Sequence, residues 1–173
     1  LKPFLYALGL DRGLFTAASE LPDVQVEFDL GKGVPYRPNN ISHTFLGPLS
    51  FQQALGNSRN IPALHVLSAV GVEPALRFFD KAGVGGIHFE PGRYGLGLAL
   101  GNLNVSLEEL CGLYGVLANE GKRLPFRMFA DEEPVEGPRL LSLGTARLIT
   151  HILGDPLARS HSFPRNRHLQ PLI

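Results

Sequence analysis

A lysine in the first turn of an apolar helix and a Ser-Arg-Asn triplet are the residues that best suit nucleophilic chemistry. Lys2 lies in the apolar segment 1–8, and Ser58-Arg59-Asn60 comes just before a second apolar segment that begins at Pro62. A neutral lysine amine can activate a serine hydroxyl, which is a weak nucleophile without an adjacent base. Each group alone also has an ordinary interpretation, because most lysines are solvated and Ser and Asn commonly cap helices or form turns.

The other reactive residues give weaker signals. Six histidines are spread along the chain without the spacing of a zinc motif, and one cysteine cannot build a thiolate metal site. They are His43, His65, His88, His151, His161 and His168. Cys111 is expected on the apolar face of a helix, where a thiol is usually a small hydrophobe. The glycines of 95–101 miss the spacing of a dinucleotide-binding loop, and the Gly-x-Ser-x-Gly elbow is absent. We therefore expect neither a metal nor a cofactor.

The composition narrows the class of protein. The chain has 173 residues, of which 44% are hydrophobic, enough for the core of one domain or of part of a larger one. Sixteen Lys and Arg balance sixteen Asp and Glu, so the net charge is zero and a nucleic-acid partner is not expected. No apolar run approaches the ~18 residues of a membrane span. Any membrane attachment would therefore come from an N-terminal anchor outside this sequence.

Capping residues, prolines and glycines predict where the helices that position these groups begin and end. The first helix carries Lys2 and Pro3 in its opening turn and stops before Gly13. Five more helices are predicted, over 50–55, 62–70, 74–82, 106–118 and 142–153. The helix over 106–118 is expected to bury one apolar face. That face comprises Leu107, Leu110, Cys111, Tyr114, Leu117 and Ala118.

Little of the sequence has the character of a strand. Apolar and polar residues alternate over 21–30, and 123–130 is a second candidate strand. Residues 31–40 and 131–138 are expected to be loops. The sequence begins inside an apolar helical pattern and ends, over 168–173, as another apolar segment starts. We therefore expect a mainly helical chain that is a fragment of a longer protein.

The order of these segments resembles the transpeptidase domain of penicillin-binding proteins, in particular the 1C-type members of the bifunctional class A group. Segment 1–8 is similar to the helix of the S-x-x-K motif, with Lys2 as its lysine and the nucleophilic serine two residues before Leu1. Ser58-Arg59-Asn60 matches the S-x-N motif, and 95–121 is similar to the stretch downstream of it. Segment 148–159 resembles the helix that precedes the third motif, K-T-G, which this sequence does not contain.

The resemblance implies a fold and a domain organisation. The expected fold class is mainly α with a few short strands, the helical lobe of the α/β (α+β) serine β-lactamase/transpeptidase-like fold, with its central sheet largely missing. Residues 1–173 would be a partial transpeptidase domain, truncated at both ends. Apolar surface would then be bare where the sheet packs, and the chain could self-associate through that face.

The resemblance also implies an activity and a set of partners. The parent protein would be a peptidoglycan D,D-transpeptidase that crosslinks D-Ala-D-Ala stem peptides through an acyl-serine intermediate and is inhibited by β-lactams. Lys2 would take the serine proton, Ser58 would relay a proton to the leaving amine, and Asn60 would bind Lys2 and the substrate amide. The segment alone, without the serine, would be inactive. The expected location is the periplasm, at the outer face of the bacterial inner membrane.

Three alternatives stay open on the sequence alone. A carboxypeptidase or a β-lactamase of the same superfamily would turn over β-lactams or cleave stem peptides without crosslinking them. A catalytically silent sensor or binding module would lack the serine two residues before Leu1. An unrelated helical domain is the third alternative.

Overall fold

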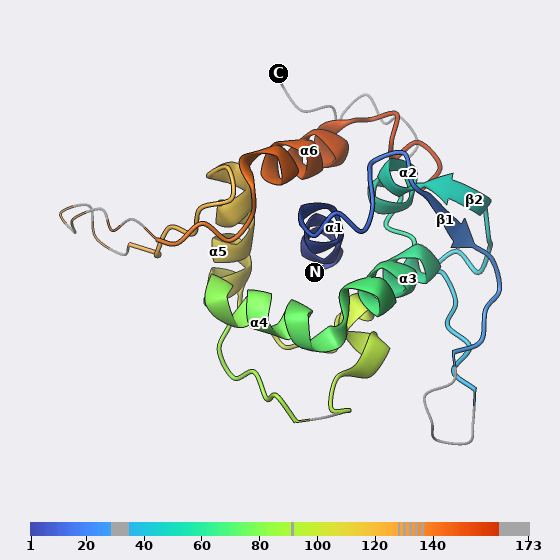
Figure 1. Cartoon of the computed structure of the whole chain (residues 1–173), viewed down its shortest axis with the longest axis horizontal. Helices are drawn as coiled ribbons and strands as arrows, with labels where there is room; N and C mark the ends of the chain where they lie inside the picture. The colour runs from blue at the N-terminus through green and yellow to red at the C-terminus, as the bar shows by residue number, and fades with distance from the viewer. Residues whose placement is uncertain are drawn as a thin grey trace.

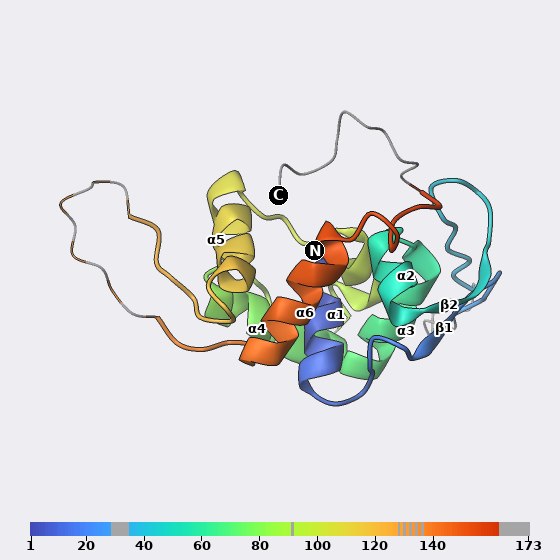
Figure 2. The same cartoon turned by 90° about the horizontal axis from the view of Figure 1, so that it is seen from above.

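The computed structural model describes residues 1–28, 35–90, 92–127, 129, 131, 133, 135 and 137–162. Helix α1 (Lys2–Asp11) lies in the middle of this structure, and the other α-helices surround it (Figure 1). They are α2 (Phe51–Gly56), α3 (Asn60–Val70), α4 (Val72–Ala82), α5 (Leu107–Ala118) and α6 (Leu143–Gly154). A short 3-10 helix, η1 (Gly95–Leu100), packs against α3. Seen from above in Figure 2, α1 and α6 lie next to each other near the centre of the molecule.

Helix α1 is buried on all sides because its sequence is apolar all the way round. Every residue from Pro3 to Gly9 is buried. A helix with this pattern belongs in the core, and not on a surface. Pro3 lies in the first turn, where its missing N–H removes no helical hydrogen bond. The predicted first helix is thus confirmed, and its first residue is Lys2.

The predicted helix starts are confirmed where a serine caps the helix. Ser50 and Ser106 each accept a hydrogen bond from the backbone three residues on, and the side chains of Gln53 and Glu109 return it. Two starts were predicted too late. Helix α3 begins two residues before Pro62, and α4 begins two residues before Pro74. A proline fits anywhere in the first turn, since those N–H groups have no partner within the helix.

The sheet is smaller than the sequence pattern predicts. Strands β1 (Glu20–Asp23) and β2 (Gly47–Ser50) form an antiparallel pair. The extended segment predicted over 21–30 is a strand only as far as Asp23. Farther on, Phe28 makes one isolated bridge to Tyr36, and residues 29–34, with part of the predicted loop, lie outside the described residues. Strand β2 was not predicted, because four residues that include a glycine and a proline carry no strand pattern.

The second predicted strand, over 123–130, is wrong for the residues that the structure describes. A single bridge joins Lys122 to Arg139, and residues 123–127 have no regular secondary structure. Pro125 has no N–H to continue a ladder, so pairing stops near Arg123. The described part of the predicted loop over 131–138 has no helix or strand, and residues 128, 130, 132, 134 and 136 lie outside the described set.

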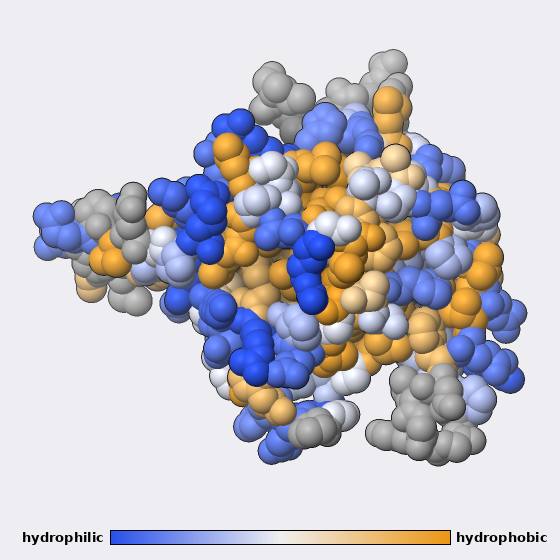
Figure 3. All heavy atoms as spheres, viewed as in Figure 1, coloured by the Kyte–Doolittle hydropathy of each residue, from blue (hydrophilic) through white to orange (hydrophobic). Residues whose placement is uncertain are grey.

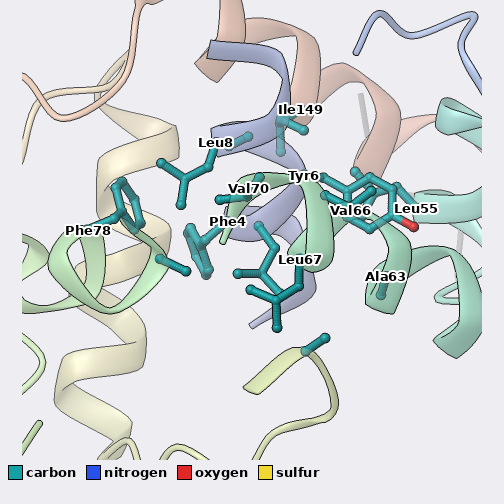
Figure 4. Packing of buried hydrophobic residues seen from close by; sticks show 14 of the residues in the cluster. Phe4, Tyr6, Leu8, Leu55, Ala63, Val66, Leu67, Val70, Phe78 and Ile149 are labelled. Atoms are coloured by element: carbon teal, nitrogen blue, oxygen red, sulfur yellow. The ribbon is translucent and has the colours of Figure 1, made fainter. Parts of the chain in front are cut away.

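The core forms where α1 packs between α3, α4 and α6. Phe4 lies beside Phe78 in Figure 4, with ring centroids 6.3 Å apart, and its ring also meets Tyr114 edge-on at 5.3 Å. Leu67 and Ile149 are fully buried in the same cluster. Burying each such side chain stabilises the fold by about 1.5–3 kcal/mol. The first turn of α1, which carries Lys2, is therefore anchored in the hydrophobic core through Phe4.

Most of the apolar face predicted for α5 is not the face that is buried. Leu107 is 78% exposed, Tyr114 is 45% exposed and Cys111 is exposed as well. Of the predicted face the helix buries Leu117 and partly buries Leu110. It also buries Leu113 and Val116, which were not predicted, against its neighbours α4 and α6. Because α5 is apolar around most of its circumference, the packing of α4 and α6 decides which side is covered. Cys111 is therefore not a small core hydrophobe.

Large apolar side chains are exposed at several places. Leu107 on α5, Phe126 in the segment that follows and Leu157 after α6 are each more than half exposed. Figure 3 shows apolar residues gathered over the central helices of one face, interrupted by a few hydrophilic ones. Such surface agrees with the expectation of uncovered apolar area. Whether a sheet packs on it stays a prediction.

Candidate active site

The side chain of Lys2 meets the Ser58–Asn60 turn directly. Its Nζ donates to Asn60 Oδ1 at 2.7 Å and to the Ser58 carbonyl oxygen at 2.6 Å. The Ser58 hydroxyl oxygen lies 3.3 Å from the same Nζ. Lys2 is more than fifty residues away from Ser58 and Asn60 in sequence, yet the three predicted site residues form one cluster.

The junction between α2 and α3 holds Ser58 toward Lys2. Helix α2 ends at Gly56, Asn57 caps it, and α3 starts at Asn60. Ser58 bridges the two helices with φ of +54°, in the left-handed region that residues other than glycine seldom adopt. This conformation leaves the Ser58 side chain exposed between two buried neighbours, Asn57 and Arg59.

Lys2 lies in surroundings that disfavour its charged form. Partial burial lowers its pKa to about 8, and the cation of Arg59 acts in the same direction. Burial removes water from the ammonium group, and a neighbouring positive charge repels it. A substantial fraction of Lys2 is therefore neutral near pH 8, as a general base must be.

A buried ion pair lies directly behind the turn. Arg59 Nε donates to Asp23 Oδ2 at 2.8 Å, and both side chains are almost fully buried. The Arg59 guanidinium also reaches Ser42 Oγ at 3.2 Å and the carbonyl oxygen of Thr44. The other oxygen of Asp23 accepts a hydrogen bond from Asn40 Nδ2 at 2.7 Å. This network joins β1 and the loop before β2 to the turn that faces Lys2.

A pocket of about 430 Å³ opens beside Lys2 and Ser58. Its walls come from the start of α1, the end of α2, η1, α5, the end of α6 and the segment after it. The lining residues are Leu1, Lys2, Pro3, Leu55, Gly56, Ser58, Ala99, Leu100, Gly101, Tyr114, Leu153 and Arg159. The volume suits a small ligand, and a reacting group bound there would lie next to the amine and the hydroxyl.

Sequence reasoning missed Asp23 and Asn40 and gave no role to Arg59. Asp23 ends a short strand and Asn40 lies in a loop, so no local spacing connects either residue to position 60. The sequence alone does not mark either residue. The structure does, because both are polar residues that the fold buries: Asp23 is 0% exposed and Asn40 is 3% exposed. Buried polar groups of this kind are nearly always hydrogen-bonded, which makes them candidates for supporting a site.

The histidines that the structure describes form no centre of their own. His43 lies 3.1 Å from the Asn39 amide, and His65 packs near Phe28, where burial lowers its pKa. Within the described ranges no three His, Cys, Asp or Glu side chains are grouped closely enough to hold a metal ion. His168 lies outside those ranges. No helix in the described part of the chain is long and apolar enough to cross a membrane.

The fold is that of solved penicillin-binding transpeptidase domains. Penicillin-binding protein 1A from Haemophilus influenzae matches with a TM-score of 0.76 and 22% identity, covering 95% of this chain and 30% of that one. The transpeptidase domain of Burkholderia pseudomallei penicillin-binding protein 3 matches with a TM-score of 0.70 and 24% identity, covering 88% and 50%. The arrangement of helices around α1 is therefore the helical lobe of this class of fold.

The chain belongs to the penicillin-binding protein transpeptidase domain family. The family model described as "Penicillin binding protein transpeptidase domain" matches residues 1–160. Penicillin-binding protein 1C of Escherichia coli K12 is 36% identical over 155 residues, which is 90% of this chain and 19% of that protein. Penicillin-binding protein 1A of Pseudomonas aeruginosa is 37% identical over 124 residues, 71% of this chain and 15% of that protein. The resemblance to this family is thus confirmed, and the chain spans less than a fifth of these relatives.

Proposed function

We propose that this chain is the helical part of a D,D-transpeptidase that crosslinks peptidoglycan stem peptides through an acyl-serine intermediate. One observation carries the proposal: Lys2 Nζ lies within hydrogen-bonding distance of both Ser58 and Asn60. A neutral amine beside a second hydroxyl and an amide can move a proton between a serine and a leaving group. Membership of the family supplies the class of substrate.

In the proposed first step, Lys2 removes the proton of a serine that lies three positions before it on the same helix. Residues with this spacing share one helix face, so the amine can reach the hydroxyl. The serine oxygen attacks the carbonyl of a D-Ala–D-Ala bond, and the bond to the terminal D-Ala breaks as the acyl-serine forms. General-base assistance of this kind contributes about 10²–10⁴ in rate.

Ser58 and Asn60 complete the proposed proton path. The Ser58 hydroxyl, 3.3 Å from Lys2, delivers the proton to the departing amine of D-Ala. Asn60 Oδ1 accepts a hydrogen bond from Lys2 at 2.7 Å and holds the amine in place. The Asn60 Nδ2 donates to the Asn39 carbonyl at 2.8 Å, and in this proposal the amide also contacts the substrate amide. An amine of a second stem peptide then attacks the acyl-serine, releases the serine and forms the crosslink.

The proposed partners follow from the same chemistry. D-Ala–D-Ala stem peptides are the substrates, and β-lactams acylate the serine as mimics of the dipeptide. The reaction takes place in the periplasm, on the outer side of the bacterial inner membrane. Self-association through an uncovered sheet-packing face is a further part of this proposal, which the exposed Leu107 and Phe126 support.

Labelling with a fluorescent penicillin tests the function. The protein that carries the complete domain, serine included, should become covalently labelled at one site. Lys2→Met should slow labelling about 10²-fold or more, because the serine loses its base. Turnover of the penicillin, in place of a stable adduct, would indicate a β-lactamase. No label on a folded protein would contradict an acyl-serine enzyme and would favour a silent binding module.

A further inference from the structure

We propose that the buried ion pair between Asp23 and Arg59 is the positioning device that holds the Ser58–Asn60 turn against Lys2. This inference rests on the proposed function and deepens it, because it assigns the middle residue of the Ser-Arg-Asn triplet a task. Arg59 touches none of the groups that would react, so it acts through its two neighbours.

Buried and more exposed side chains alternate along the turn, and each buried side chain is hydrogen-bonded to a different part of the fold. Asn57 points inward and bonds to the segment after α6, where its Nδ2 donates to the Ala158 carbonyl at 2.8 Å. Arg59 points inward and binds Asp23 of β1. Ser58 and Asn60, between and after them, are directed toward Lys2. Fixing Arg59 therefore fixes the direction of both residues that meet the amine.

Asp23 acts on the turn through a second route. Its Oδ1 accepts from Asn40 Nδ2 at 2.7 Å, and Asn40 Oδ1 in turn accepts the backbone N–H of Asn60 at 2.9 Å. The Leu46 N–H donates to Asp23 Oδ2 at 3.0 Å. One carboxylate thus restrains the turn through Arg59 and also through Asn40.

Burial makes a purely stabilising role for this pair a poor explanation. The two side chains are only 6% and 0% exposed to solvent. Well-packed apolar residues often stabilise a fold as well as a buried ion pair does. What charged partners add is a fixed geometry. The turn needs one, because the left-handed backbone of Ser58 persists only where its surroundings hold it.

The shape of arginine is part of the device. Its flat guanidinium contacts the Asp23 carboxylate, the Ser42 hydroxyl and the Thr44 carbonyl at the same time. A lysine carries the same charge as a single point on a flexible stem and cannot copy this fork. Arg59→Lys therefore keeps the charge and removes the fixed geometry.

The test uses the protein with the complete domain and measures the rate constant and the end point of labelling by a fluorescent penicillin. Two variants are compared: Arg59→Lys, and the neutral pair Asp23→Asn with Arg59→Gln, which leaves no buried charge alone. The matched control neutralises an exposed pair on α4, with Glu73→Gln and Arg77→Gln, whose side chains are about two-thirds exposed.

We expect both test variants to lose about tenfold or more in rate constant, because misplacing a catalytic group by an ångström can cost 10². The labelled fraction at long times should stay complete, and the control should match the native protein. A purely structural role would give the reverse: a smaller labelled fraction that reacts at the native rate. Either that result, or native rates in both variants, would overturn the inference.

A second measurement separates this inference from the proposed function. NMR signals of the lysine side chains report the titration of Lys2 without any acylation. In the native protein Lys2 should titrate near pH 8, and in Arg59→Lys, which keeps the positive charge, nearer the ordinary value of 10.5. The neutral pair removes the Arg59 cation that itself lowers this pKa, so Arg59→Lys is the decisive variant in this measurement. If penicillin fails to label the native protein, the proposed function fails. Unchanged titration of Lys2 in Arg59→Lys would refute the positioning role in either case.

Discussion

Asn57 and Ala158 are joined by a buried hydrogen bond that spans 101 residues of sequence, from the Asn57 amide to the Ala158 carbonyl oxygen at 2.8 Å. The same amide group donates to the Gln53 carbonyl at 2.9 Å, and its oxygen accepts the N–H of Ser162 at 2.7 Å. One side chain therefore closes α2 and ties the segment after α6 to the residue that precedes Ser58.

Removing this side chain should destabilise the fold. Asn57→Ala leaves the buried Ala158 carbonyl without this donor, whereas the Gln53 carbonyl keeps the backbone N–H of residue 57 and Ser162 is exposed. Leaving one buried carbonyl unpaired costs about 1–3 kcal/mol of unfolding free energy. Urea denaturation of the complete domain measures the loss. Asn104→Ala serves as the control, because Asn104 is exposed and its replacement should change the free energy by less than about 0.5 kcal/mol. Equal stability of the two variants would show that the segment after α6 is not held by Asn57.

The left-handed backbone of Ser58 predicts that stability and activity respond differently to substitution. Ser58→Ala keeps the strained φ of +54° and removes the hydroxyl, whereas Ser58→Gly removes the hydroxyl and also relieves the strain. The glycine variant should be more stable than the alanine variant by about 1 kcal/mol. Both should acylate slowly, to a similar degree, since neither can relay a proton. Thermal unfolding and penicillin labelling of the two variants, side by side, check this; a more stable alanine variant would contradict it.

Local signals were enough to predict most of the helices, and the resemblance to a family supplied three candidate site residues. Capping boxes at Ser50 and Ser106 depend on contacts within four residues, so they can be read along the chain. Lys2, Ser58 and Asn60 were identified by their motif order and context, and the structure brings them together.

Features that depend on partners distant in sequence were missed. Asp23 and Asn40 form hydrogen bonds to Arg59 and Asn60, which lie about twenty or more positions away and which no spacing rule connects to them. The prediction of which face of α5 is buried failed at most positions for the same reason. When a helix is apolar on nearly every side, its own sequence does not determine which side the neighbouring helices cover.

Two leucines on α5 allow the buried and the exposed face of this helix to be distinguished by experiment. Leu113 is fully buried and Leu107 is 78% exposed, although both lie on the same helix. Leu113→Ala should cost about 2–5 kcal/mol, because it removes buried methyl groups and leaves a cavity. Leu107→Ala should change stability by less than about 0.5 kcal/mol. Urea denaturation of both variants compares them directly. A large loss at Leu107 would mean that another part of the complete domain covers this face.

The lowered pKa of Lys2 predicts the pH dependence of acylation. Lys2 must be neutral to accept the serine proton, so the rate should rise with pH and reach half its maximum near pH 8, where the pKa lies. Below that pH the ammonium form dominates, and the rate should fall about tenfold for each unit. The rate constant of penicillin labelling, measured between pH 6 and pH 10, records this rising limb of the pH–rate profile.

Asn60→Asp should move that limb in a known direction. It places a carboxylate where the Asn60 oxygen lies 2.7 Å from Lys2 Nζ, with almost no change in shape. An anion at this distance stabilises the ammonium form, so the pKa of Lys2 rises and the limb moves to higher pH. Asn104→Asp adds the same charge at an exposed position outside the Lys2 pocket and should leave the limb in place. If the limb stayed at the same pH in Asn60→Asp, some group other than Lys2 would be responsible for it.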